Sequence, residues 1–158
     1  MKKISLIVSF FLLLISSKCM HEKMDSVYYM YNNADYDVFV GFGLFHATYL
    51  YPDTIFEQLH NYRLIKSYSF NEYYVGETLE ENIKRTTPID TVSIFYFHAD
   101  TINKYSWEII QRDYKILRRY DLSSQDIVTL KDHRGIPEIP YPPDERMKDM
   151  KMYPPYGK

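Results

Sequence analysis

The strongest constraint on the fold is the stretch of residues 89–130, in which strand and helix patterns alternate. Residues 92–97 alternate with a period of two, are rich in β-branched and aromatic side chains, and are apolar on both faces. That pattern predicts a central strand of a sheet. Helical spacing follows over residues 107–114, an extended pattern over residues 114–120, and a new helix start at Ser123. The stretch predicts an order of elements, but it does not indicate a molecular activity.

Two helix starts are specified by capping sequences. Thr78 and Glu81 have the spacing of a capping box, and so do Ser123 and Asp126. In such a box the first side chain bonds a backbone N–H of the first turn, and the acidic side chain bonds back. We therefore expect a short helix after each cap, the first ending near Arg85.

The first strands are predicted from two extended runs, residues 27–31 and residues 36–42. The cluster at residues 32–35 contains Asn and Asp, which favour turns because their side chains bond the local backbone. We expect the two runs to form a hairpin. Gly41 and Gly43 lie in the second run, where strand glycines are typical of a bulge or bend.

Weaker strand patterns occur at residues 63–70 and 73–75, and residues 51–54 have the composition of a proline turn. Together these patterns predict a mainly β fold with short helices, an antiparallel sheet or sandwich in a single domain. A chain of 158 residues with 46% hydrophobic content can form one such core. Trp107 is expected to be buried beside the central strand, and its truncation to Ala to cost about 3–5 kcal/mol.

Charge and aromatic content limit the partners. With 19 basic and 21 acidic residues the formal charge is -2, which gives no field that would attract nucleic acid. Aromatic residues make up 17% of the chain, including 17 tyrosines. Tyrosine suits both half-exposed sheet faces and binding surfaces, so the excess does not choose between them.

The amino terminus has the pattern of a secretory signal peptide over residues 1–18. Two lysines precede an apolar run at residues 4–15, which is shorter than the roughly 20 residues of a membrane-spanning helix. Cys19, the single cysteine, follows at once. It resembles the cysteine of bacterial lipoproteins, which implies that its sulfur takes a diacylglycerol and that cleavage makes Cys19 the first residue. Lys18 departs from the small residue usual before that cysteine, and the alternative is a soluble secreted protein cleaved near residues 16–17.

The rest of the chain divides by composition. Residues 19–26 are polar and short of β-branched side chains, as expected of a tether between the membrane and a domain. Residues 27–133 carry the strand and helix patterns of a β-rich globular domain. Residues 134–158 contain six of the eight prolines, so we expect a polyproline-like or disordered tail that packs neither as helix nor as sheet. Such a tail is either a flexible terminus or a docking peptide for a partner's aromatic groove.

Several segments together resemble one group of proteins. They are residues 51–54, residues 97–101, Trp107, residues 114–123 and residues 126–127. In order and spacing they are similar to small, uncharacterised lipoproteins of Bacteroidetes. The resemblance implies a β-rich single domain anchored by lipid in the cell envelope, at the outer membrane. It implies no activity and no catalytic residues, and this chain departs from the group near residue 131 and in its Pro-rich tail.

No motif indicates catalysis, a metal or a cofactor. The histidines are scattered, without the spacing of a zinc site, and are His21, His46, His60, His98 and His133. The serines lack a nucleophile elbow, and no phosphate-binding or dinucleotide-binding glycine loop occurs. A carboxylate pair drawn from Glu57, Glu80 and Glu81 could serve glycoside hydrolysis only at a suitable separation.

Three hypotheses for function follow. The first is a lipid-anchored, non-catalytic binding module that holds a protein or glycan through its aromatic sheet or its tail. The second is a small envelope hydrolase that uses His98 or His46 with neighbouring carboxylates such as Asp100. The third is an immunity-type lipoprotein that neutralises a toxin. The missing nucleophile, metal cluster and cofactor loop favour binding over catalysis.

Overall fold

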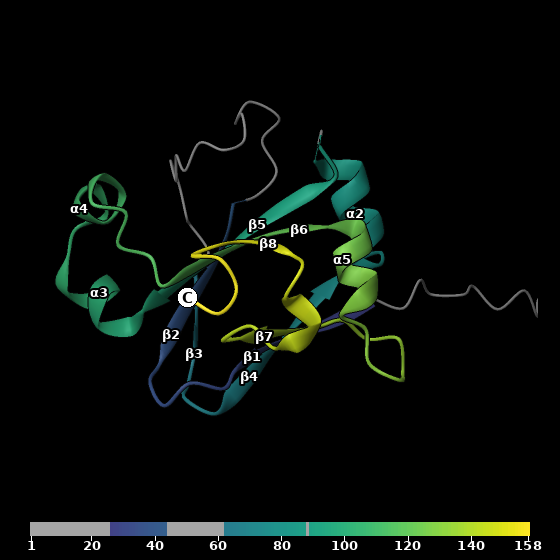
Figure 1. Ribbon diagram of the computed structural model, residues 1–158, viewed down its shortest axis with the longest axis horizontal. Helices are drawn as coiled ribbons and strands as arrows, with labels where there is room; N and C mark the ends of the chain where they lie inside the picture. Colours follow the sequence, from purple (N-terminus) through teal and green to yellow (C-terminus); the bar gives the residue numbers. More distant parts are fainter. Residues whose placement is uncertain (1–25, 44–61, 88) are drawn as a thin grey trace, which may run out of the picture.

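The computed structural model describes residues 26–43, 62–87 and 89–158. Cys19 and the turn predicted at residues 51–54 lie outside these residues. The described chain folds into two β-sheets with a few short helices (Figure 1). This confirms the predicted fold class, a mainly β single domain.

Each sheet has its own set of strands. The three-stranded sheet has the order β4-β1-β7 and contains β1 (Ser26–Asn32), β4 (Ser69–Val75) and β7 (Glu138–Tyr141). The five-stranded sheet has the order β3-β2-β5-β6-β8 and contains β2 (Val38–Gly43), β3 (Arg63–Ile65), β5 (Thr91–His98), β6 (Arg118–Ser123) and β8 (Lys151–Tyr153). Neighbouring strands are antiparallel except for β1 and β7, which are parallel. β5 is the middle strand of its sheet, as the sequence predicts.

The helices lie at the two ends of the sheets. α2 (Leu79–Thr86) and α5 (Ser124–Thr129) lie side by side at one end, and both begin at the predicted capping boxes (Figure 1). α3 (Ala99–Lys104) and α4 (Trp107–Arg112) lie at the opposite end, and a 3-10 turn, η1 (Glu145–Met147), precedes β8. Among the described residues, no helix is long and apolar enough to cross a membrane.

The main core lies between the two sheets. The ring of Tyr96 on β5 stacks on the ring of Tyr141 on β7, with 4.7 Å between centroids. Fully buried aliphatic side chains from β5, β7 and α2 fill the same core, among them Ile94, Ile139 and Ile83. Apolar burial of this kind is the dominant favourable contribution to folding.

A second, smaller core covers the other face of the five-stranded sheet. Phe95 and Phe97 project there from β5 and pack with Ile110 of α4. Trp107 is half-buried in this cluster, edge-on to Phe97 at 5.8 Å between centroids. The expected contact with the central strand is present, but burial is incomplete because Trp107 begins the helix at the margin of the cluster.

The predicted hairpin of residues 27–31 and 36–42 is wrong. β1 and β2 belong to different sheets. The Asn32 side chain explains why: it is fully buried and donates to the carbonyl oxygens of Tyr36, Ile65 and Lys66. The turn cluster therefore carries the chain from one sheet to the other. No bulge forms at Gly41 either, since β2 pairs with β5 in continuous register.

The prediction that residues 134–158 pack neither as helix nor as sheet is also wrong. β7 adds to the three-stranded sheet and β8 adds to the five-stranded sheet. Pro140 is tolerated in β7 because backbone groups alternate in direction along a strand. The carbonyl oxygens of Pro137 and Tyr141 face β1, accepting from the N–H groups of Tyr29 and Asn33, so the nitrogen of Pro140 points away from β1.

Candidate functional site

His98, a residue of the hydrolase hypothesis, has a structural role. Its Nδ1 accepts a hydrogen bond from the backbone N–H of Asp100 at 3.1 Å and so caps α3. Its ring stacks on Tyr36, with 4.7 Å between centroids. The Asp100 carboxylate is 3.7 Å from Nδ1 and is exposed. His98 and Asp100 lie close together, as their spacing in the sequence allows, but their arrangement is that of a helix cap. His46 lies outside the described residues.

The candidate carboxylates are explained in the same way. Glu81 closes the capping box of α2 through the backbone N–H of Thr78, and Glu80 pairs with Lys131 across to the loop after α5. Glu57 lies outside the described residues. In the described ranges, no group of three or more His, Cys, Asp or Glu side chains could hold a metal ion.

One carboxyl group is buried on the five-stranded sheet. Asp121 accepts a hydrogen bond from the Ser93 hydroxyl at 2.7 Å and lies 3.2 Å from the guanidinium of Arg119. Burial raises the pKa of Asp121, while Ser93 and Arg119 act to lower it. Buried polar groups are normally satisfied in this way, so the contacts are those of a structural carboxylate.

A cluster of aromatic side chains occupies the outer face of the three-stranded sheet. On β1, Tyr29 and Tyr31 alternate with the buried Tyr28, Met30 and Asn32. In the register of β1 with β4, Tyr31 lies opposite Phe70 and Val27 lies opposite Tyr74. Residues directly opposite on paired strands share a face. We call Tyr29, Tyr31, Phe70 and Tyr74 the aromatic face.

Three rings of the aromatic face contact one another, and two of its four side chains are exposed. The Phe70 ring lies edge-on to Tyr29 at 5.5 Å and tilted to Tyr31 at 5.3 Å between centroids. Phe70 is 47% exposed and Tyr74 is 65% exposed. The Tyr74 hydroxyl donates to the Glu72 carboxylate at 2.7 Å, which raises the pKa of Tyr74. Exposed aromatic groups of this size on a regular sheet are typical of interaction surfaces.

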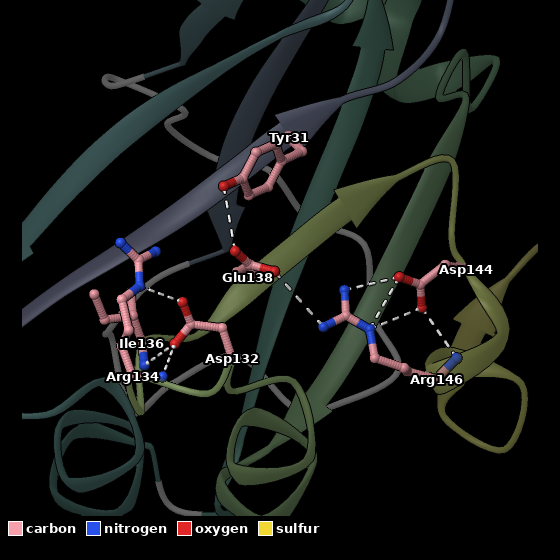
Figure 2. A network of polar contacts seen from close by, with 7 residues as sticks. All are labelled: Tyr31, Asp132, Arg134, Ile136, Glu138, Asp144 and Arg146. Carbon is pink, nitrogen blue, oxygen red and sulfur yellow. Dashed lines mark hydrogen bonds and ion pairs between the residues drawn. The ribbon is translucent and has the colours of Figure 1, made fainter.

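Charged groups of β7 and of the η1 turn after it lie beside Tyr31 of the aromatic face (Figure 2). The Tyr31 hydroxyl donates to Glu138 at 3.3 Å, and the Arg146 guanidinium lies 3.8 Å from the other Glu138 oxygen. Arg146 also donates to Asp144 at 2.7 Å, which raises the pKa of Arg146. These side chains are thereby held in place beside the rings.

The loop before β7 places a further charged group, that of Arg134, beside Tyr29 of the aromatic face. The Asp132 carboxylate accepts from the backbone N–H groups of Arg134 and Ile136 and from the Arg134 guanidinium, at 2.8, 2.9 and 2.6 Å (Figure 2). Desolvation raises the pKa of Asp132, but these bonds outweigh it and lower the pKa to about 2. Arg134 lies over the ring of Tyr29 at 5.9 Å from its centroid. The arrangement offers aromatic surface with fixed hydrogen-bonding groups, which suits non-covalent binding.

Sequence patterns alone did not identify the aromatic face. The signal that could have found it is the outward half of the alternation in residues 28–31 and 70–74. What was missing is the pairing of β1 with β4, because 36 residues lie between Asn32 and Ser69 and no local pattern links the two strands. A scan against family models finds no match to the chain, and searches of curated proteins and of solved structures find no similar protein.

Proposed function

We propose that the protein is a lipid-anchored binding module of the cell envelope, without a catalytic centre, that holds its partner through the aromatic face. The observation that carries this proposal is the exposure of Phe70 and Tyr74 on one sheet face, where Tyr29 and Tyr31 pack against the Phe70 ring and Glu72 holds the Tyr74 hydroxyl. Rigid aromatic side chains bind with a small ordering cost. The structural roles of His98 and Glu81 weigh against the hydrolase hypothesis.

The anchor is proposed from Cys19 and the apolar run before it. A Cys19→Ala variant is expected to leave the membrane fraction, because the acyl chains that hold the protein are attached at that sulfur. Membrane fractionation of cells that express each form measures this. Recovery of the Cys19→Ala protein in the membrane fraction to the same extent as the wild type would refute the proposal.

The binding surface is tested by removing its exposed rings. A Phe70→Ser/Tyr74→Ser variant should lose capture of a partner from envelope extracts by about tenfold or more, since exposed aromatic anchors carry much of the affinity of an interface. An Ile89→Ser/Val128→Ser variant is the matched control, because Ile89 and Val128 are also exposed apolar side chains, at 57% and 44%, but lie elsewhere. Equal capture by both variants would show that the aromatic face is not the binding surface.

A further inference from the structure

β4 forms one of the two edges of the three-stranded sheet. In the described part of the chain, β4 pairs only with β1. The direction of its backbone groups follows from two hydrogen bonds on the other side of β1: Tyr29 donates to Pro137 at 2.9 Å and Asn33 donates to Tyr141 at 2.6 Å. Odd-numbered residues of β1 therefore face β7, and even-numbered residues face β4.

The same alternation carries over to β4. Tyr28 and Met30 face β4, and their partners are Tyr73 and Asn71. Antiparallel partners of this kind exchange both backbone bonds, so the N–H and C=O groups of Asn71 and Tyr73 are used within the sheet. The backbone groups of Phe70, Glu72 and Tyr74 consequently point away from β1, to the outer edge. These are also the residues whose side chains are exposed on the outer face of the sheet.

A second copy of the chain fits this edge poorly. Antiparallel pairing of two β4 strands about their centre would place Glu72 directly opposite Glu72, and like charges in that position destabilise a sheet. A basic side chain opposite Glu72 would instead stabilise the pair. The Tyr74 hydroxyl, bonded to Glu72 Oε2, keeps that carboxylate on the outer face, ready for such a partner.

We propose that the outer edge of β4 binds an extended segment of another protein as an additional antiparallel strand. The segment carries a Lys or Arg opposite Glu72, with apolar side chains two residues before and after it, opposite Phe70 and Tyr74. Main-chain bonds to an exposed sheet edge supply affinity in this mode, and alternate side chains supply specificity. This inference rests on the proposed function and names its partner class.

The test uses a synthetic peptide, TVTKTVT with blocked ends, and the isotope-labelled full-length chain in detergent. On binding, the amide protons of Phe70, Glu72 and Tyr74 should exchange more slowly with solvent, while those of Asn71 and Tyr73 stay as slow as before. The matched peptide TVTETVT should bind about fivefold more weakly, in line with the energies of cross-strand charge pairs. In a Glu72→Lys variant the order of the two peptides should reverse.

Three results would overturn the edge site. The first is that no amide signal changes its chemical shift at millimolar TVTKTVT, and the second is equal affinity for the two peptides. The third is binding that shifts the ring signals of the aromatic face without slowing the hydrogen exchange of the Phe70, Glu72 and Tyr74 amides. A neutral oligosaccharide that gives this last pattern would identify a glycan site. In that case the proposed function stands and the strand partner fails. The proposed function fails separately if the Phe70→Ser/Tyr74→Ser variant captures partners as well as the wild type does.

Discussion

Deleting residues 137–158 should abolish cooperative unfolding. The deletion removes β7 and β8, one strand from each sheet, and with them five side chains buried in the main core: Ile139, Tyr141, Met147, Met150 and Met152. Burial of a large apolar side chain stabilises a fold by about 1.5–3 kcal/mol. The summed loss, about 10 kcal/mol, is as large as the whole stability of a typical domain.

Urea denaturation followed by circular dichroism measures this effect. A deletion of residues 157–158 alone is the control, since Gly157 and Lys158 are exposed. It removes the bond from Arg118 to the Lys158 carbonyl oxygen and the bond from the Lys158 N–H to the Pro155 carbonyl oxygen, but no side chain of the main core. The control should unfold cooperatively. If the chain without residues 137–158 keeps a wild-type transition, the segment is a detachable tail after all.

Local patterns predicted much of the fold. The capping boxes at Thr78 and Ser123 and the period of two in residues 92–97 are confirmed, because each depends on contacts within a few residues. The prediction of a hairpin was wrong because strand pairing depends on contacts between distant residues. Whether two neighbouring strands pair depends on contacts that each makes with distant parts of the chain. In β1 the deciding contacts are the hydrogen bonds from the Asn32 side chain to the carbonyl oxygens of Ile65 and Lys66.

The prediction for the Pro-rich segment, residues 134–158, was wrong for a related reason. Proline content argues against a central strand, but β7 is an edge strand, and Pro140 lies where no backbone donor is needed. Glu138 is partly exposed, but Ile139, Pro140 and Tyr141 are all buried, and this short apolar run is a signal that the count of prolines obscured. For the candidate site, the sequence left two binding elements open, the aromatic sheet and the Pro-rich tail. It could not select Tyr29, Tyr31, Phe70 and Tyr74, since their common face exists only through long-range pairing.

Among substitutions in the described residues that leave the side-chain volume nearly unchanged, Asn32→Asp should destabilise the fold most. The Asn32 amide group donates to the carbonyl oxygens of Tyr36, Ile65 and Lys66 at 2.7, 3.2 and 3.1 Å, and its own oxygen accepts from the N–H of Ala34. A carboxylate keeps the bond from Ala34 but has no donor, and it places a charge among three acceptors in a fully buried site. We expect a loss of about 3–5 kcal/mol at neutral pH.

The loss should depend on pH with a definite sign. Burial and the surrounding carbonyl oxygens raise the pKa of the introduced carboxyl above its value of about 3.9 in the unfolded chain. The folded state therefore binds a proton more readily than the unfolded state, and the variant should lose less stability near pH 4 than at pH 8. Urea unfolding at both pH values measures this, with Asn33→Asp as the control because the Asn33 side chain is exposed. A loss that is equal for the two variants, or that grows as the pH falls, would contradict the role given to Asn32 in joining the sheets.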